Sequence, residues 1–409
     1  MESDRRRESP FKKMLSHPRR RIAHAFLSDR EFSLMLAAGF VSGIATGINN
    51  SVFSNFLHEV YHLTEMQRGF VEFPREFPGV MVIFLFAVLS FLGSTRLAAL
   101  SMVLSCLGML GLGLFSPSFP VMLIWMFVLN MGIHIFLPLV PGMGMELSHR
   151  ENYGIRLGRY SAYNLAATII GYVIIWLGFD YLSLTYTAAF TIAAVCYFAA
   201  AVLLMYMKPM PKVKKQRLVF KKKYLLFYAL SVVNGARKQI FLTFAPWVLI
   251  KIYGVDAPKI AIYGIIVAVV SIGTRTIIGK AIDKLGEKVV LSAEAVLLVV
   301  LCMGYAFAAD IFPTSVALII TAACYIADNS LAAVEMARST YVKKISDDAA
   351  DVIPTLSTGV SLDHIVSMSI PIFGGMLWLA LGYQLVFIFA SAIAVINLVL
   401  SLRIRIKQH

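Results

Sequence analysis

The chain has 409 residues, of which 59% are hydrophobic and only 15% are charged, and its formal net charge is +14. A soluble core has no room for that much apolar surface, so we expect lipid to surround much of the chain. The basic residues lie in short segments beside apolar runs, which is the positive-inside pattern of membrane proteins. That pattern excludes a nucleic-acid partner.

The first 30 residues are basic and contain no early apolar run, so we expect no secretory signal peptide. Apolar runs long enough to cross a bilayer need about 20 residues. We expect all of them to be helices, because in lipid only helices and closed barrels satisfy every backbone group. Twelve such runs follow along the chain, at 32–57, 67–92, 97–115, 119–141, 157–178, 184–207, 224–250, 259–279, 289–309, 314–337, 353–379 and 383–402.

Lysine and arginine residues set the predicted orientation of these spans. Of the 37 in the chain, thirty fall in the segments on one side of the predicted membrane. Only Arg68, Lys251 and Lys259 fall on the other side. This asymmetry predicts an integral protein of the plasma membrane with both termini in the cytoplasm.

A basic segment at residues 208–223 separates the first six spans from the last six. We expect it to be a cytoplasmic linker that lies against anionic headgroups. The predicted organisation is therefore a basic cytoplasmic segment, a six-helix half, the linker, a second six-helix half and a cytoplasmic tail. Their bounds are 1–31, 32–207, 208–223, 224–402 and 403–409.

A charged turn between the eighth and ninth spans carries a recognisable motif. Gly279, Asp283, Lys284, Gly286 and Lys288 match the pattern G-x-x-x-D-[RK]-x-G-x-[RK]. This stretch resembles the loop signature of the major facilitator superfamily. The resemblance implies twelve helices in two pseudo-symmetric six-helix bundles that rock around a site near the midplane.

The same resemblance implies a gating loop formed by Arg275, Gly279, Asp283 and Gly286. Arg275 lies close enough in sequence to approach Asp283 at the cytoplasmic boundary. The corresponding turn in the first half, at residues 93–96, lacks the aspartate. We therefore expect only the second half to keep the latch, and we expect its contacts to stabilise the outward-open state.

Ionisable groups inside spans are costly and are candidates for function. The second span contains Glu72, Arg75 and Glu76 next to two prolines that loosen the helix. Glu72 and Glu76 share one helix face, and Arg75 can neutralise Glu72. Two interpretations stay open: an internally paired cluster that shapes a bend, or a group that acts in gating or transport.

The second half contains more such groups: Arg237 and Lys238 in span seven, Asp328 and Glu335 in span ten, and Asp363 with His364 in span eleven. We expect Arg237 or Lys238 to pair with Asp328 or Asp363. The pairs are either structural or part of a proton or substrate site, and His364 could relay protons.

Asparagine and histidine residues extend the candidate cavity into the first half. By the resemblance, Asn50, Asn130, His134, Arg237 and Asp328 face the substrate. The alternative for the asparagines is hydrogen bonding between helices, which is their usual use in membranes.

The sequence contains no phosphate-binding loop, metal-binding motif or nucleophile elbow, so we expect neither an enzyme nor a cofactor nor a bound metal. The predicted function is secondary active transport of a small polar or ionic solute, coupled to protons, by a monomer in the lipid bilayer. A multidrug exporter of the same fold and a non-transporting sensor or scaffold are the alternatives.

Overall fold

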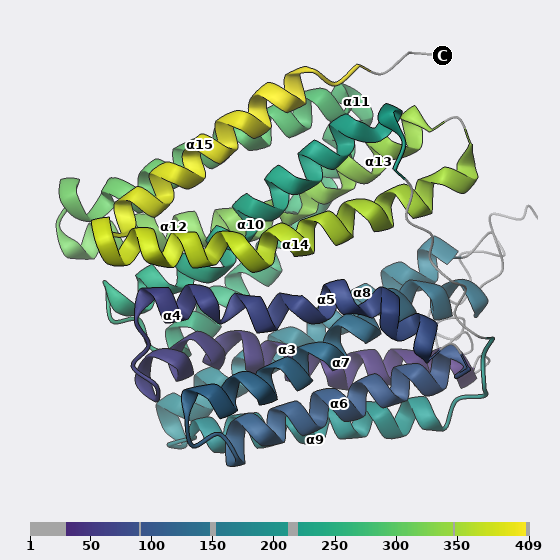
Figure 1. Cartoon of the computed structure of the whole chain (residues 1–409). Coiled ribbons are helices and arrows are strands. Elements are labelled where there is room, and N and C mark those ends of the chain that lie inside the picture. The colour runs from purple at the N-terminus through teal and green to yellow at the C-terminus, as the bar shows by residue number, and fades with distance from the viewer. Residues whose placement is uncertain (1–29, 90, 148–152, 212–219, 347, 406–409) are drawn as a thin grey trace, which may run out of the picture.

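The structure is a computed structural model that describes residues 30–405, apart from positions 90, 148–152, 212–219 and 347. Throughout these described ranges the regular secondary structure is helical. The helices form two groups, which lie one above the other in Figure 1. The predicted all-α fold class is therefore confirmed.

The first group contains the helices of the N-terminal part of the chain. They are α3 (Arg30–Glu59), α4 (Glu65–Phe70), α5 (Glu72–Val88), α6 (Ser94–Leu114), α7 (Phe119–Glu146), α8 (Tyr153–Tyr181) and α9 (Tyr186–Met205). Within this group α3 packs on α8, and α6 packs on both α7 and α9. Small residues allow the close approach: a Cβ atom at Gly43 of α3 would lie 2.6 Å from the carbonyl oxygen of Asn164 in α8.

The second group contains the remaining helices. They are η1 (Lys222–Tyr224), α10 (Leu225–Lys251), α11 (Ala257–Ile311), α12 (Thr314–Ser330), η2 (Leu331–Val334), α13 (Glu335–Ile345), α14 (Ala349–Leu381) and α15 (Tyr383–Leu402). Buried aromatic rings hold α10, α11 and α15 together. Tyr305 stacks on Phe387 with 4.5 Å between ring centroids, and Phe241 packs edge-on against both rings.

Nine helical segments in the described part of the chain are long and apolar enough to cross a membrane. The expected second span consists of α4 and α5, separated only by Val71, and the expected tenth span consists of α12, η2 and α13. Helix α11 covers the expected eighth and ninth spans, and its backbone leaves helical geometry at Gly286, where φ is 81°. The expected positions thus agree with the helices, while the exact count of twelve stays a prediction.

The two groups of helices meet through α14 against α4 and α5, and through α11 against α8 and α3. At the end of α4 the contact is very close, because a Cβ atom at Gly375 would lie 2.9 Å from Cα of Met66. An ion pair between Lys251, at the end of α10, and Glu65 joins the groups at the same place. This end, opposite the side where α9 and α15 end, is closed.

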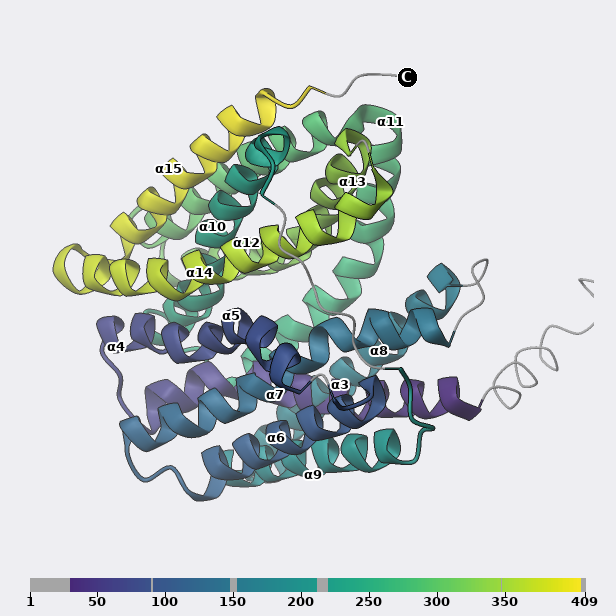
Figure 2. The ribbon, with the colours of Figure 1, turned by 45° about the vertical axis from the view of Figure 1, so that its right-hand side comes forward.

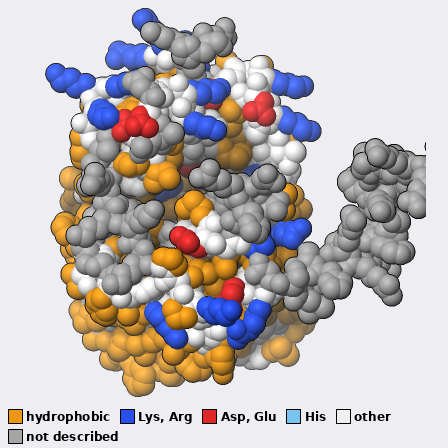
Figure 3. All heavy atoms as spheres, turned by 90° about the vertical axis from the view of Figure 1, so that its right-hand side faces the viewer, with side chains coloured by type: hydrophobic (Ala, Val, Ile, Leu, Met, Phe, Trp, Pro, Cys, Tyr) orange, Lys and Arg blue, Asp and Glu red, His pale blue; other side chains and the backbone are white. Residues whose placement is uncertain are grey.

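The groups lie farther apart at the other end. Figure 2 shows them diverging toward the side where α9 and α15 end. Figure 3 looks onto that side, and Lys and Arg side chains gather on it while apolar side chains cover the flank. Arg30 at the start of α3 and Lys221 just before η1 have 65% and 55% of their side chains exposed. Basic residues on this side are what a cytoplasmic placement would require.

We expect Gly375→Ala to destabilise the closed end. Overpacking of a close contact costs about 1–3 kcal/mol, so the midpoint of thermal unfolding in detergent should fall by several degrees. Gly273→Ala is the matched control, because no atom lies within 4 Å of the Cβ that it adds to α11. The control should unfold at the same temperature or a higher one, since alanine favours helix over glycine. Equal losses in the two variants would contradict a tight contact at Gly375.

Candidate functional site

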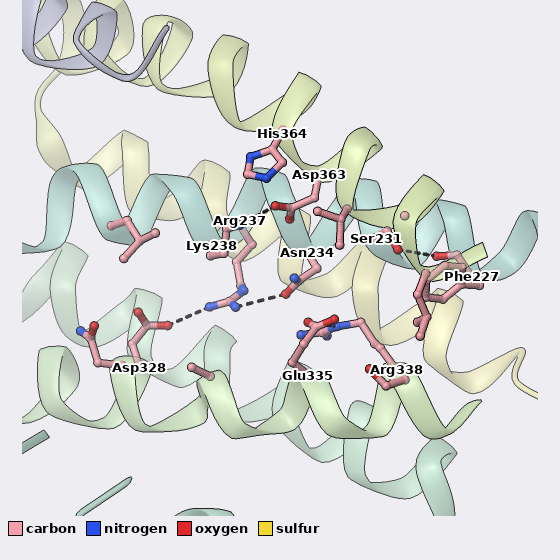
Figure 4. Close-up of a pocket in the computed structure, with 17 residues that line it drawn as sticks. Phe227, Ser231, Asn234, Arg237, Lys238, Asp328, Glu335, Arg338, Asp363 and His364 are labelled. Carbon is pink, nitrogen blue, oxygen red and sulfur yellow. Dashed lines mark hydrogen bonds and ion pairs between the residues drawn. The ribbon is translucent and has the colours of Figure 1, made fainter. Parts of the chain in front are cut away.

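A cavity of about 520 Å³ lies between α10, α12, α13 and α14 (Figure 4). Charged and polar side chains of both signs line it, together with apolar ones. All six ionisable residues that the sequence predicts for the second half are on its wall: Arg237, Lys238, Asp328, Glu335, Asp363 and His364. The structure therefore brings together residues that are separated by up to 127 positions in the chain.

Arg237 and Asp328 form a buried ion pair across the cavity, from α10 to α12. Nη1 of Arg237 donates to Oδ1 of Asp328 over 2.8 Å, and Nη2 donates to Oδ1 of Asn234 over 3.3 Å. Only 6% of Arg237 and 8% of Asp328 are exposed. Each charge alone would cost several kcal/mol to desolvate, about the amount that the pairing offsets. The expected pairing of these residues is thus present.

A second layer of charges lies behind this pair. Glu294 of α11 is 3% exposed and lies 4.0 Å from Arg237 and 3.3 Å from Arg338. Arg338 also donates from Nε to Glu335 over 2.8 Å. Sequence reasoning overlooked Glu294. Glu294 could have been found, because it is a single carboxylate inside the apolar run 289–309. Asp328 was identified by the same reasoning.

Lys238 pairs with Asp363 and so connects α10 to α14. Gly235, one helical turn earlier, makes room for this approach, because a Cβ atom there would lie 2.6 Å from Oδ1 of Asp363. About 35% of the Lys238 side chain is exposed, against 8% for Arg237. This pair is therefore the more accessible of the two, and a solute that enters the cavity can reach it.

The predicted cluster in α5 lies at the boundary between the two groups of helices. Glu72 is fully buried and pairs with Arg68 over 2.6 Å and with Arg75 over 3.3 Å. Gln239 of α10 donates to its other carboxylate oxygen over 2.7 Å. The predicted pairing of Arg75 with Glu72 is present. The roles of Arg68 and Gln239 were missed, because Arg68, at the very start of the second predicted span, was counted with the loop residues.

Glu76 has different partners from Glu72, although the two residues share a face of α5. Nδ1 of His364 lies 2.8 Å from Oε2 of Glu76, and Nε2 of His134 lies 3.9 Å from the same atom. His364 therefore turns toward α5 rather than toward Asp363, its neighbour in the chain. The role of His364 in relaying protons stays a prediction.

The two asparagines of the first half have different positions. Asn130 is buried and donates to the carbonyl oxygen of Met126 within its own helix, over 2.8 Å. Asn50 is exposed on α3. Neither lies on the wall of the cavity in Figure 4.

The predicted gating loop is only partly as expected. Gly286 supplies a backbone conformation with positive φ, which glycine adopts without strain. Gly279 does not support a close helix approach, because no atom lies within 4 Å of a Cβ placed there. Arg275 and Asp283 are both exposed, and in the described part of the chain no ion pair joins them in this conformation. The paired carboxylate of this turn is instead Glu287, which is fully buried and lies 2.7 Å from Lys344.

Comparison with known proteins gives one family. Residues 35–362 match the model of the Major Facilitator Superfamily. No curated protein matches the chain in a sequence comparison.

Solved structures of transporters have the same fold. The nucleoside transporter NupG superposes with a TM-score of 0.71 at 12% identity, over 91% of this chain and 99% of that one. A D-xylose-proton symporter superposes with a TM-score of 0.67 at 16% identity, over 91% of this chain and 97% of that one. An inward open conformation of the xylose transporter XylE from E. coli has a TM-score of 0.66 at 15% identity, over 90% of this chain and 94% of that one. At these identities the likeness shows the fold alone.

We expect Arg237→Leu to destabilise the protein strongly, because it leaves Asp328 charged and buried without its partner. Loss of one member of a buried pair costs about 3–5 kcal/mol, whereas an apolar replacement of both is often neutral. The double variant Arg237→Leu with Asp328→Leu should therefore recover most of the stability. Thermal unfolding of the purified variants in detergent measures both effects.

Lys238→Leu is the control for this cycle, since its side chain is partly exposed and its loss should cost less. If Arg237→Leu alone unfolded like the unchanged protein, the pair would not contribute to the stability of the fold.

Proposed function

We propose, since the chain belongs to the major facilitator superfamily, that it is a secondary active transporter that moves a small polar or ionic solute by alternating access. Proton coupling is part of this proposal. The observation that carries it is the cavity of the second group of helices, whose wall holds two ion pairs within reach of a solute.

The charges on the cavity wall favour a polar or ionic solute. Arg237 and Lys238 are paired with Asp328 and Asp363, so an ionic group on the solute could replace one partner without leaving the other charge uncompensated. Among the described residues that line the cavity, Phe227 is the one Phe, Tyr or Trp. A broad apolar pocket, which the multidrug exporter would need, has less support. A non-transporting sensor remains an outcome of the experiments below.

Asp363 is our candidate for the proton carrier. Protonation of its carboxylate would remove the charge that holds Lys238, and Lys238 is more exposed than the other cavity cations, Arg237 and Arg338. The binding of a proton to Asp363 and the binding of a solute to Lys238 would then be coupled, because both change the same ion pair. A D-xylose-proton symporter is among the structurally similar proteins, which supports this coupling.

The shape of the molecule agrees with an inward-facing state of a transporter in the plasma membrane with cytoplasmic termini. The closed end carries the contact of Gly375 with α4, and the diverging end carries the basic side chains. Arg275 and Asp283 are exposed and not joined to each other here. That fits a latch whose contacts form only in the outward-facing state.

A thermal-shift screen against panels of metabolites and drugs would identify the solute, because a ligand that binds only the folded state raises the midpoint with its concentration. Counterflow of the identified solute in proteoliposomes then separates a transporter from a sensor. A protein that binds a compound but never exchanges it across the vesicle membrane would overturn the proposal.

We expect Asp363→Asn to abolish uptake driven by a pH gradient while counterflow without a gradient persists. The amide keeps the shape of the side chain but cannot exchange a proton near neutral pH. Asp256→Asn is the matched control, because Asp256 caps α11 at the closed end and asparagine caps equally well. Gradient-driven uptake by Asp363→Asn at the unchanged rate would remove Asp363 from the proton path.

We expect Asp283→Ala to favour the inward-open state by removing a latch of the outward-open state. A cysteine introduced at Ser231, on the cavity wall, should then react faster with a membrane-impermeant thiol reagent from the open end. Asp310→Ala, which changes an exposed carboxylate at the far end of α11, is the control. Equal labelling rates in the presence and absence of Asp283 would contradict the latch.

A further inference from the structure

Three side chains from three helices meet where the two groups of helices touch. Glu76 comes from α5, His134 from α7 and His364 from α14, and their ligand atoms all lie within 4.8 Å of one another. Nδ1 of His364 and Nε2 of His134 are 2.8 Å and 3.9 Å from Oε2 of Glu76. At most 15% of each side chain is exposed. We call these three residues the His-Glu cluster.

We propose that the His-Glu cluster binds a divalent transition-metal ion of the zinc, cobalt or nickel type and thereby bridges the two groups of helices. Two imidazoles with one carboxylate form a donor set that suits these metals. Two ligand atoms bound to one such ion lie about 3.3 Å apart in tetrahedral geometry. The observed separations bracket that value, so small rotations of the side chains would complete the site.

The hydrogen bonding of His134 orients it as a ligand. Its Nδ1 lies 2.9 Å from the carbonyl oxygen of Asn130, an acceptor that fixes the proton on Nδ1. Nε2 then presents its lone pair to the carboxylate of Glu76. In the neutral ring these two acceptors lie 3.9 Å apart, and a cation between them, either a metal ion or a proton on Nε2, would offset their repulsion. A backbone carbonyl that holds the far nitrogen is also the usual second partner of a metal-bound histidine.

Gly79 makes the space in which the two rings approach α5. A Cβ atom at this position would lie 2.8 Å from Cδ2 of His134 and 2.8 Å from Nδ1 of His364. It follows Glu76 by three residues, so the carboxylate and the gap lie on one face of the helix. The backbone therefore leaves room for both rings beside the carboxylate.

Charge and access also permit an ion at this place. The nearest cation in α5, Arg75, is 3.3 Å from both carboxylate oxygens of Glu72, which offsets its charge. His364 lines the cavity, so an ion can enter from the open end. Once bound, it would tie α14 of the second group to α5 and α7 of the first. It would hold the closed end shut and slow exchange between the two states.

Binding can be measured without any solute, and so its outcome does not depend on the proposed transport. We would treat the full-length protein in detergent with a chelator and titrate it with Co²⁺, following the visible absorption of the ion. The titration would be repeated calorimetrically with Zn²⁺. We expect one ion per chain and an affinity at least tenfold weaker in Glu76→Gln, His134→Asn and His364→Asn.

Two further variants separate ligation from folding. Gly79→Ala should weaken binding without removing a ligand, because the added methyl group displaces both rings. His58→Asn, in α3, changes a histidine outside the cluster and should bind like the unchanged protein. Stoichiometry near zero, or an affinity that the three ligand variants leave unchanged, would overturn the proposal. A cluster that binds only protons would give that result.

Discussion

The cost of placing charge in a medium of low polarity is the constraint on which the structure depends. Within the described helices the buried charged groups Arg237, Asp328, Glu294 and Glu72 all lie within reach of an opposite charge. Each such contact offsets the desolvation cost of both partners only as long as the two charged groups stay close together. The pairs therefore fix the helices that carry them. The pairs also mark the positions where a charged group of a solute could replace one partner. The same residues would then stabilise the fold in one state and bind the solute in another.

The two groups of helices use different means to pack. In the first group and at the closed end, small residues bring helix backbones together, as at Gly43 and Gly375. This packing needs no charge and varies little with the occupant of the cavity. In the second group, α10, α12 and α14 are held around the cavity by Arg237, Lys238 and their carboxylates. In the proposed transporter the charged wall is therefore the part that would respond to a solute.

The sequence predicted the helices well because apolar runs of membrane length have few alternative structures. It also predicted the pairing of Arg237 with Asp328, since ionised groups in the spans are few and each needs a partner. It could not predict the approach of His134 to His364, whose ring centroids lie 5.0 Å apart, because helices α7 and α14 come from different groups. Nor could spacing along the chain show that Arg275 and Asp283 would not pair here, since that depends on the conformational state.

Glu72 and Glu76 show how one helix can hold both a fixed and an exchangeable charge. Glu72 accepts from Arg68, Arg75 and Gln239, which compensates its charge within the protein. Glu76, one turn further along α5, faces two imidazoles, which are neutral unless they gain a proton. A carboxylate that accepts from neutral rings retains affinity for a cation. Since α5 belongs to one group and His364 to the other, a cation bound there would change the free energy of separating the two groups. The boundary that would open in the proposed alternating access thus contains the proposed cation site.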